Sequence, residues 1–541
     1  MMKNILKNKH YKNIILISLA FLFTHGFIAV ATGTWWDETT WEFLTNEEMW
    51  EIALQLGKPS SYFLQNYIFS ISEPIARIII LSCFYIATLG MYYIYQRLPY
   101  VDIQGAFWLT IIYNALPIND ARIMKGVFPY TVGYMFFIIG FCILIFLQEK
   151  YQYKNIPVRM LVLIMFFCSF TLNSNLVMYF VPLMYILIYI VKNGLWKRWY
   201  YYTDFLCIPI IYFLLKNTLY PAYGLYEGYN NVSIRGLIHG FVKTFSVCTR
   251  RIGDCFEFWL QTNLGKGLAV IILVAVLYTV YKHWKNRENK PDVYSATKKC
   301  LKLMGLGYIA MYFGAYAYVV IGQSCRLNDM IGRSSILLGI GLAVIFYALI
   351  RMIPHQKIQA FVFGLILFCG LVHFNMYYLS YQQDYYRQQD FVYELRANSR
   401  CLDTTKNIYY ITNDTSLIHP TRFYTLNANG RVAFGDQTHF FMESKDDYSY
   451  LRGTGIYNLE TFVHSTSSNM SDYNIGRSNE IEAFVKYNND IGLLETARLK
   501  WYEMVDYAKF EQELYGEKNL EIYTRDMPEY KQLMSDLELD T

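Results

Sequence analysis

Charged residues are scarce in this chain. Only 17% of its 541 residues are Asp, Glu, Lys or Arg, while 54% are hydrophobic and 18% aromatic. Soluble domains typically carry about 25% charged residues. The shortage is confined to residues 1–380, where apolar runs alternate with short polar pieces, whereas residues 381–541 contain no long apolar run. We therefore predict a membrane domain at 1–380 and a soluble domain at 381–541.

Two other absences narrow the classes of function. The net charge is only +5, and no stripe of Lys and Arg follows the chain, which excludes a nucleic-acid partner. The ten Cys form neither CxxC pairs nor Cys/His clusters, so no structural zinc site is expected. Cys248 and Cys255 fall in one polar stretch and are candidates for a disulfide.

Long apolar runs indicate an all-α polytopic membrane protein. A spanning helix needs about 20 mostly apolar residues, and by that criterion we predict about 11 spans. They lie near residues 13–32, 74–96, 102–118, 127–147, 158–172, 175–192, 203–221, 266–283, 303–323, 334–351 and 358–379. The first is too long for a signal peptide and has no small-residue cleavage site, so we expect it to remain as a helix.

The distribution of Lys and Arg predicts the orientation in the plasma membrane. With every span crossed once, the basic connections fall on one side, at residues 1–12, 97, 150–159, 192–198, 282–299 and 351–357. Cytoplasmic loops carry the excess of Lys and Arg. We therefore expect a cytoplasmic N-terminus and an extracytoplasmic C-terminal domain.

The outer side holds two long loops, 33–73 and 222–265, and the C-terminal domain. In that domain Asn407–Ile411 has the composition of a strand, and the charged pieces 480–488 and 494–514 are interpreted as helical. We predict a small α/β domain.

The first outer loop begins with an unusual sequence, Trp35-Trp36-Asp37-Glu38. Its Trp residues suit the membrane interface, which would place Asp37 and Glu38 at the outer bilayer surface. Apolar residues of 43–56 follow at amphipathic spacing, typical of helices that lie along a membrane. The alternative is a simple aromatic anchor followed by a solvated acidic turn.

Cations in outer loops run against the usual charge distribution and favour an anionic ligand. The candidates for binding a phosphate are Arg122, Lys125, Arg326 and Arg333 in the short outer loops, and Arg77 and Lys216 near the outer ends of apolar spans. The alternative is that each side chain snorkels or pairs, for example Arg122 with Asp120 and Arg326 with Asp329. His25 and His373 lie within apolar spans and are interpreted as packed, isolated histidines.

This layout resembles the GT-C superfamily of integral membrane glycosyltransferases, and within it bacterial enzymes of surface-polysaccharide synthesis, similar to O-antigen glucosyltransferases. The matching features are Trp35-Trp36-Asp37-Glu38 after the first span, the amphipathic stretch 46–56 and the outer C-terminal domain. The resemblance implies a sugar on a polyprenyl phosphate as donor, a glycan or glycolipid as acceptor, and Asp37 as the catalytic acidic residue with Glu38 as the neighbouring candidate.

The chemistry expected of such a site is direct displacement with inversion. Asp37 would accept the proton of an acceptor hydroxyl, and Arg326 or Arg333 would stabilise the departing phosphate. Asp120 and Asp329 are candidates for second acids or for ligands of a divalent metal, Mg²⁺ or Mn²⁺. Three alternatives stay open: a polysaccharide polymerase or ligase, a transporter, and a non-enzymatic membrane assembly protein.

Overall fold

The computed structural model describes most of the helical body and parts of the C-terminal domain. The described residues are 9–35, 38, 41–42, 44–228, 232–260, 270, 274, 278, 291–323, 325–327, 330–353, 355–397, 407–412, 429–430, 432–433, 441–442, 480–488, 491–516, 520–524 and 527–536. Asp37 and Asp329 lie outside these residues, as does the predicted span 266–283 apart from three isolated positions.

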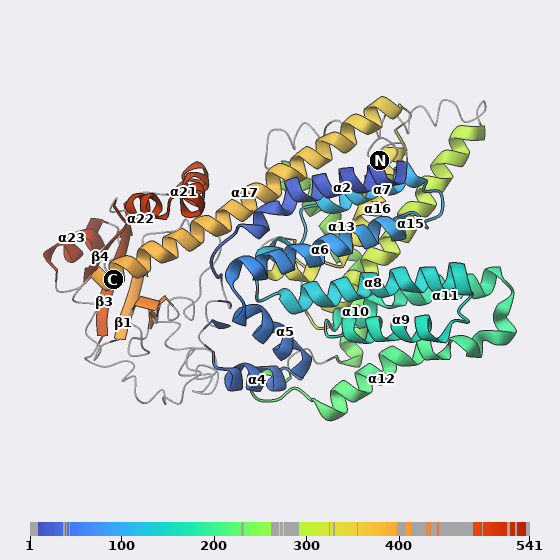
Figure 1. Cartoon of the computed structure of the whole chain (residues 1–541), viewed down its shortest axis with the longest axis horizontal. Coiled ribbons are helices and arrows are strands. Elements are labelled where there is room, and N and C mark those ends of the chain that lie inside the picture. Colours follow the sequence, from blue (N-terminus) through green and yellow to red (C-terminus); the bar gives the residue numbers. More distant parts are fainter. Residues whose placement is uncertain are drawn as a thin grey trace.

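Helices make up the larger body of the protein, which occupies the right-hand part of Figure 1. In chain order they are α2 (Lys9–His25), η1 (Gly26–Ala29), α4 (Asn46–Gln55), α5 (Pro59–Ser70), α6 (Glu73–Tyr95), α7 (Ile103–Ala115), η2 (Asp120–Ile123), α8 (Phe128–Tyr151), α9 (Ile156–Ser169), α10 (Ser174–Met178), α11 (Phe180–Lys192), η3 (Leu195–Tyr202), α12 (Thr203–Leu219), η4 (Gly224–Tyr226), α13 (Ile234–Leu260), α15 (Pro291–Val319), η5 (Met330–Ser335), α16 (Leu338–Arg351) and α17 (Gln356–Ala397).

Five segments are long and apolar enough to cross a membrane: Lys9–Ala29, Glu73–Tyr95, Phe128–Tyr151, Ser174–Lys192 and Gln356–Ala397. They coincide with five of the predicted spans. The predicted span 303–323 falls largely on the 29-residue helix α15, which is not among these five segments. Four other predicted spans fall on α7, α9, α12 and α16, which have 13, 14, 17 and 14 residues. These helices are shorter than the roughly 20 residues that a bilayer core requires. Eleven spans therefore stay a prediction.

The predicted outer loop 222–265 is largely the 27-residue helix α13. Three tyrosines of α15, spaced four residues apart, hold it in place. Tyr308, Tyr312 and Tyr316 donate to the carbonyls of Phe245, Phe241 and Leu237 over 3.2, 2.8 and 3.1 Å. These three hydrogen bonds require α13 and α15 to lie antiparallel and side by side. The sequence of either helix alone does not indicate that packing.

The disulfide proposed between Cys248 and Cys255 is wrong, because both thiols are free. The two residues lie seven positions apart on one helix, which separates them by about 10 Å along its axis. Disulfides require Cα atoms within about 7 Å. Both side chains are buried instead, on the face of α13 that packs against the protein.

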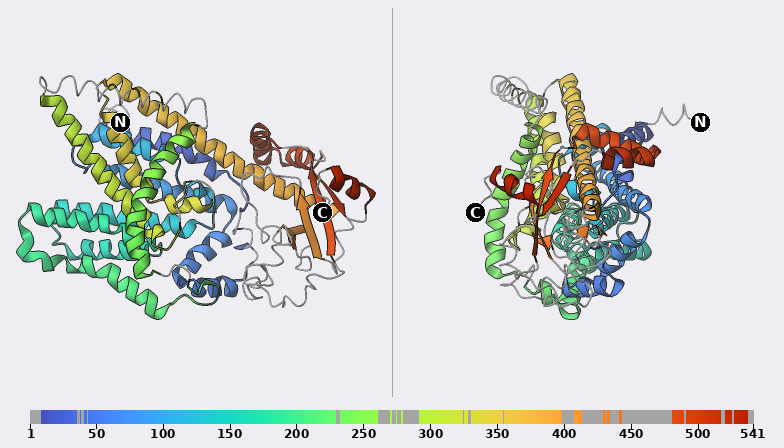
Figure 2. Two further views of the ribbon diagram at one scale, coloured as in Figure 1. Left: turned by 180° about the vertical axis from the view of Figure 1, so that it is seen from behind. Right: turned by 90° about the vertical axis from the view of Figure 1, so that its left-hand side faces the viewer.

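α17 joins the helical body to the C-terminal domain and crosses residue 380 without a break (Figure 1). Its last turns form part of the core of that domain, where Phe391, Val392 and Leu395 pack with Val485 and Ile522. Figure 2 shows the domain around the C-terminal end of α17, seen from behind and from the side.

The domain contains a four-stranded mixed sheet with the order β2-β1-β3-β4. The strands are β1 (Asn407–Thr412), β2 (Phe441–Met442), β3 (Glu480–Tyr487) and β4 (Leu520–Thr524), with helices α21 (Leu493–Val505), α22 (Tyr507–Gly516) and α23 (Pro528–Asp536). β1 pairs in parallel with β2 and β3, and β3 is antiparallel to β4.

The strand at 407–411 and the helical character of 494–514 are therefore confirmed, but the helical prediction for 480–488 is wrong. The sequence Glu480-Ile-Glu-Ala-Phe-Val-Lys-Tyr487 places Glu480, Glu482, Phe484 and Lys486 on one face and Ile481, Ala483, Val485 and Tyr487 on the other. This two-residue period and the β-branched residues fit a strand. The helical interpretation gave more weight to the charged residues of 480–488 than to this alternation.

Candidate functional site

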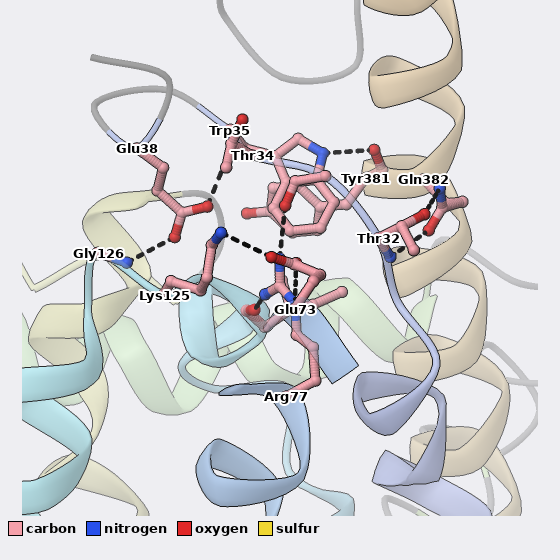
Figure 3. Close-up of polar contacts among 12 residues, drawn as sticks. Thr32, Thr34, Trp35, Glu38, Glu73, Arg77, Lys125, Gly126, Tyr381 and Gln382 are labelled. Carbon is pink, nitrogen blue, oxygen red and sulfur yellow. Dashed lines mark hydrogen bonds and ion pairs between the residues drawn. The ribbon is translucent and has the colours of Figure 1, made fainter. Parts of the chain in front are cut away.

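The acidic segment after α2 is anchored by Glu38. Its carboxylate Oε2 accepts the backbone N–H of Trp35 at 3.2 Å, and Oε1 accepts the backbone N–H of Gly126 at 2.6 Å (Figure 3). The first contact is local, because a Glu can reach back to the N–H three residues earlier. The second ties the segment to the turn before α8. A Cβ at position 126 would lie 3.2 Å from Cγ of Glu38, so the Glu38 side chain would have to shift by a few tenths of an ångström to accept it.

Glu38 has no exposed surface. Its burial raises the pKa of the carboxyl group to about 7, although Arg77, Lys125 and the two backbone donors each act to lower it. Removal from water disfavours the ionised form, and this effect exceeds the attraction of the cations. The segment that was expected to be a catalytic loop therefore contains a carboxyl group that is part protonated near neutral pH.

Two predicted cations, Arg77 and Lys125, lie beside this anchor and share Glu73. Lys125 Nζ is 2.6 Å from Glu73 Oε2 and 3.0 Å from Glu42 Oε1. Arg77 Nε donates to Glu73 Oε1 over 2.7 Å, its Nη1 donates to the carbonyl of Ile123, and its Nη2 donates to the carbonyl of Gly33 over 2.5 Å. Figure 3 shows Glu73 between the two cations.

The start of α6 explains this geometry. Ser72 is in the extended conformation and Pro74 follows Glu73, a combination that begins helices. Glu73 then lies in the first turn, where the helix dipole favours an anion, and Arg77 follows four residues later on the same face. The sequence signal for the site was thus the Glu73–Arg77 spacing, although only Arg77 had been identified as a candidate.

The cations of this cluster are saturated by protein groups. Arg77 is fully buried, and its guanidinium carbon also lies 4.9 Å from the ring of Trp35. Burial acts to lower the pKa of Lys125, but Glu73, Glu42 and Glu38 act in the opposite sense and raise it overall. For these two residues the pairing alternative is confirmed. Glu42 and Glu73 are the partners that sequence reasoning had missed.

A second buried cluster contains Asp120 and Arg122, which do not pair with each other as the alternative reading had suggested. Asp120 is fully buried and its Oδ1 lies 3.4 Å from His373 Nε2. Arg122 donates to the carbonyls of Asn119 and Ile118 over 3.0 and 2.6 Å, and its Nη1 lies 3.1 Å from His25 Nε2. The two histidines are thus not isolated.

The remaining predicted cations lie elsewhere. Arg326 is exposed, and Arg333 is half-buried with its guanidinium carbon 5.7 Å from the ring of Tyr130. Arg333 belongs to η5, which contacts η2, so its segment adjoins the one that carries Asp120 and Arg122. Lys216, on α12, is close enough to Lys58 for their charges to interact. Of the acidic candidates, Asp37 and Asp329 lie outside the described residues.

A divalent metal ion would need several carboxylate, imidazole or thiolate side chains close together. Within the described part of the chain, no group of three or more His, Cys, Asp or Glu side chains gathers closely enough to hold a metal ion. Asp120 and His373 meet as a pair, without a third such ligand among those residues. These residues do not fit a metal centre.

No protein family model, curated protein or solved structure matches this chain.

Proposed function

We propose that this chain is a membrane glycosyltransferase. It moves a sugar from a polyprenyl-phosphate donor to a cell-surface glycan or glycolipid on the outer face of the plasma membrane, with inversion. The acidic segment that follows α2 supplies the base, and cations of the outer loops bind the donor phosphate.

The observation that supports this proposal best is the state of Glu38. Burial raises the pKa of Glu38 to about 7 although Arg77 and Lys125 lie near it, and its two backbone hydrogen bonds hold the segment to which Asp37, the preceding residue in the chain, belongs. Perturbed carboxyl groups of this kind cluster at functional sites, although structural networks also produce them. An aromatic anchor with a solvated acidic turn, the alternative reading, would not bury this carboxylate beside two cations.

The two carboxylates of the segment have different roles in this proposal. Both oxygens of Glu38 already accept backbone N–H groups, so Glu38 fixes the segment on the turn before α8. Asp37 accepts the proton of the acceptor hydroxyl. The acceptor oxygen then attacks the anomeric carbon, the bond from that carbon to the phosphate oxygen breaks, and the lipid phosphate leaves with the bonding electrons.

The phosphate contact is assigned to Arg326 or Arg333. Arg77 and Lys125 are held by Glu73 and by backbone carbonyls, and Arg122 by two carbonyls, so each would have to give up existing partners to bind a phosphate. Arg326 is exposed, and an arginine can form a bidentate contact with phosphate oxygens.

The donor class is tested by supplying each donor alone to the purified protein in proteoliposomes. We expect transfer from a polyprenyl-phosphate sugar and none from a nucleotide sugar. Arg326→Ala should lower kcat/KM about tenfold to a hundredfold, the effect of one lost charge-assisted contact. Arg333→Ala is the paired test. Transfer from the nucleotide sugar only would exclude both the donor class and the family resemblance. Products of many added units would indicate a polymerase.

The base is tested by Asp37→Asn, which keeps the size of the side chain but removes its basicity. We expect turnover to fall about 10²–10⁴-fold while the protein stays in the membrane with a normal elution profile. Glu47→Gln, an exposed substitution in the same outer loop, is the control and should retain wild-type turnover. Near-normal turnover of Asp37→Asn would remove this residue from the role of base.

A further inference from the structure

Residues 31–35 form a strap without regular secondary structure between η1 and the acidic segment, and it is held from several sides. The backbone N–H of Thr32 donates to Gln382 Oε1 on α17 over 3.1 Å, and the Gln382 amide donates back to Thr32 Oγ1 over 2.9 Å (Figure 3). Trp35 Nε1 donates to the carbonyl of Tyr381 over 2.6 Å. The strap is therefore fixed along the outer part of α17.

The backbone conformation of the strap requires glycine at position 33. Its φ of +104° lies in a region that side chains rarely adopt, and a Cβ there would lie 2.2 Å from the ring of Tyr385. Its carbonyl also accepts Arg77 Nη2. The strap thus connects α6 and α17 two residues ahead of Trp35, and its conformation leaves no room for any other residue at position 33.

The C-terminal domain reaches the same strap through α21. Thr32 Oγ1 lies 2.8 Å from Glu503 Oε1 and 3.0 Å from Lys500 Nζ. Lys500 and Glu503 pair over 2.7 Å, with side chains only 5% and 15% exposed, and the hydroxyl of Tyr386 donates to Glu503 over 2.6 Å. A charged pair that is this well buried is costly unless its hydrogen bonds are satisfied, and Thr32 is one of the groups that satisfy it.

The packing of α21 keeps this contact in place. Leu499, next to Lys500, is buried with Tyr386, Ile491, Phe510 and Leu514 in a core shared by α17, α21 and α22. The charged pair therefore stands on a helix that cannot rotate without breaking an apolar core. The contact between α21 and the strap is consequently part of a built interface rather than a meeting of two surface side chains.

We propose that α21 is a positioning element for the acidic segment, acting through Lys500 and Glu503 on Thr32, five residues ahead of Asp37. The C-terminal domain thereby controls where the base stands relative to the donor. The catalytic part of this inference rests on the proposed function, whereas the mechanical part does not.

Hydrogen exchange at the amide of Thr32 tests the mechanical part in the full-length protein. Glu503→Gln should speed exchange there about tenfold to a hundredfold, the effect of one lost charge-assisted hydrogen bond on local opening. Because Glu503→Gln leaves Lys500 buried without a charge partner, two further variants are needed. Thr32→Val removes the hydroxyl and with it the bonds of that hydroxyl to Glu503, Lys500 and Gln382, whereas Lys500→Met combined with Glu503→Gln removes both charges and leaves the bonds between Thr32 and Gln382 in place. Glu495→Gln, on the same helix but in an exposed pair with Arg498, is the control and should leave exchange unchanged.

Turnover with a polyprenyl-phosphate sugar tests the catalytic part. We expect Thr32→Val and Glu503→Gln to lower kcat with the donor KM unchanged, since neither touches the cations assigned to the phosphate. Unchanged exchange at Thr32 in these variants would overturn the proposal. Faster exchange with wild-type kcat would also overturn it, because the contact would then be structural only. If the wild-type protein uses no lipid-linked sugar, the proposed function fails, but the exchange result still decides whether α21 holds the strap.

Discussion

The carboxyl group of Glu38 is enclosed by two backbone N–H donors and lies within the electrostatic influence of Arg77 and Lys125. Its pKa depends on a balance between burial, which dominates, and these four groups. The first donor could be foreseen, because Trp35 precedes Glu38 by three residues. The second, Gly126, is 88 residues away, and no local pattern indicates it. The identity of the acidic motif was therefore accessible from the sequence, whereas the burial of Glu38 was not.

Glu38 should make the stability of the protein depend on pH. In the unfolded chain this carboxyl ionises near pH 4.5, and in the folded protein its pKa is raised to about 7 by burial. Between these two pH values the folded state binds more protons than the unfolded state. The contribution of Glu38 to the free energy of unfolding is therefore fully present below about pH 4.5 and is lost as the pH rises through 7. The loss amounts to about 3 kcal/mol.

The measurement compares thermal unfolding of the purified protein with that of Glu38→Gln at pH 5 and pH 8. The wild-type protein should lose more stability across this interval than the variant, which cannot ionise at position 38. Glu47→Gln, whose side chain is exposed, should follow the wild-type curve. Parallel curves for wild type and Glu38→Gln would show that the carboxyl titrates normally.

At the scale of elements, Glu73 joins the start of α6 to the turn before α8. It bonds Arg77 on its own helix and Lys125 on that turn, and both cations are buried. The apolar period of 74–96 predicted α6, and the Ser72–Glu73–Pro74 start is readable in the sequence. The ion pair between Glu73 and Lys125 could not be predicted from the sequence, because it depends on how α6 packs against the turn before α8.

Glu73→Gln should be strongly destabilising. The amide of Gln can still accept a hydrogen bond but carries no charge, so Arg77 would lose its anionic partner and Lys125 would keep the half-exposed Glu42 as its ion-pair partner. Breaking a buried ion pair from one side costs about 3–5 kcal/mol. Glu149→Gln provides a matched control, because Glu149 forms a pair with Arg97 over 3.0 Å at an exposed site. Exposed pairs contribute about 0–1 kcal/mol. Thermal unfolding of both variants measures the difference, and equal losses would contradict this account of Glu73.

Other elements show which sequence signals were reliable. The amphipathic stretch 46–56 is α4, which begins at a capping box of Thr45 and Glu48. The capping box and the amphipathic spacing lie within the segment itself, so the helix could be predicted from the sequence. The segment 480–488 was misread because its charge was weighted above its two-residue period. The placement of α13 depends on tyrosines of α15 some 60 to 80 residues away, which is a tertiary contact and gives no local signal.

At the scale of the whole molecule, α17 is the element that relates the membrane body to the C-terminal domain. Its 42 residues extend about 63 Å, more than the roughly 40–45 Å of a complete bilayer. The residues of its outer half include buried polar groups, among them Gln382, Gln383, Asp384 and Arg387. These side chains are covered by other parts of the protein, so this half of α17 packs as an element of the C-terminal domain.

The orientation of the molecule is the prediction on which the proposed function depends most. The basic connections predict a cytoplasmic N-terminus and an extracytoplasmic C-terminal domain. An impermeant thiol reagent applied to intact cells should label Leu494→Cys, since Leu494 is 91% exposed on α21. Lys154→Cys, exposed in a basic connection, should be labelled only after the membrane is permeabilised. Both substitutions are made in a background without Cys207, which is exposed, and without Cys401, so that neither native thiol contributes. Labelling of Lys154→Cys in intact cells, with protection of Leu494→Cys, would reverse the orientation. The acidic segment would then face the cytoplasm, where nucleotide sugars are available, and a lipid-linked donor at the outer leaflet could not reach it.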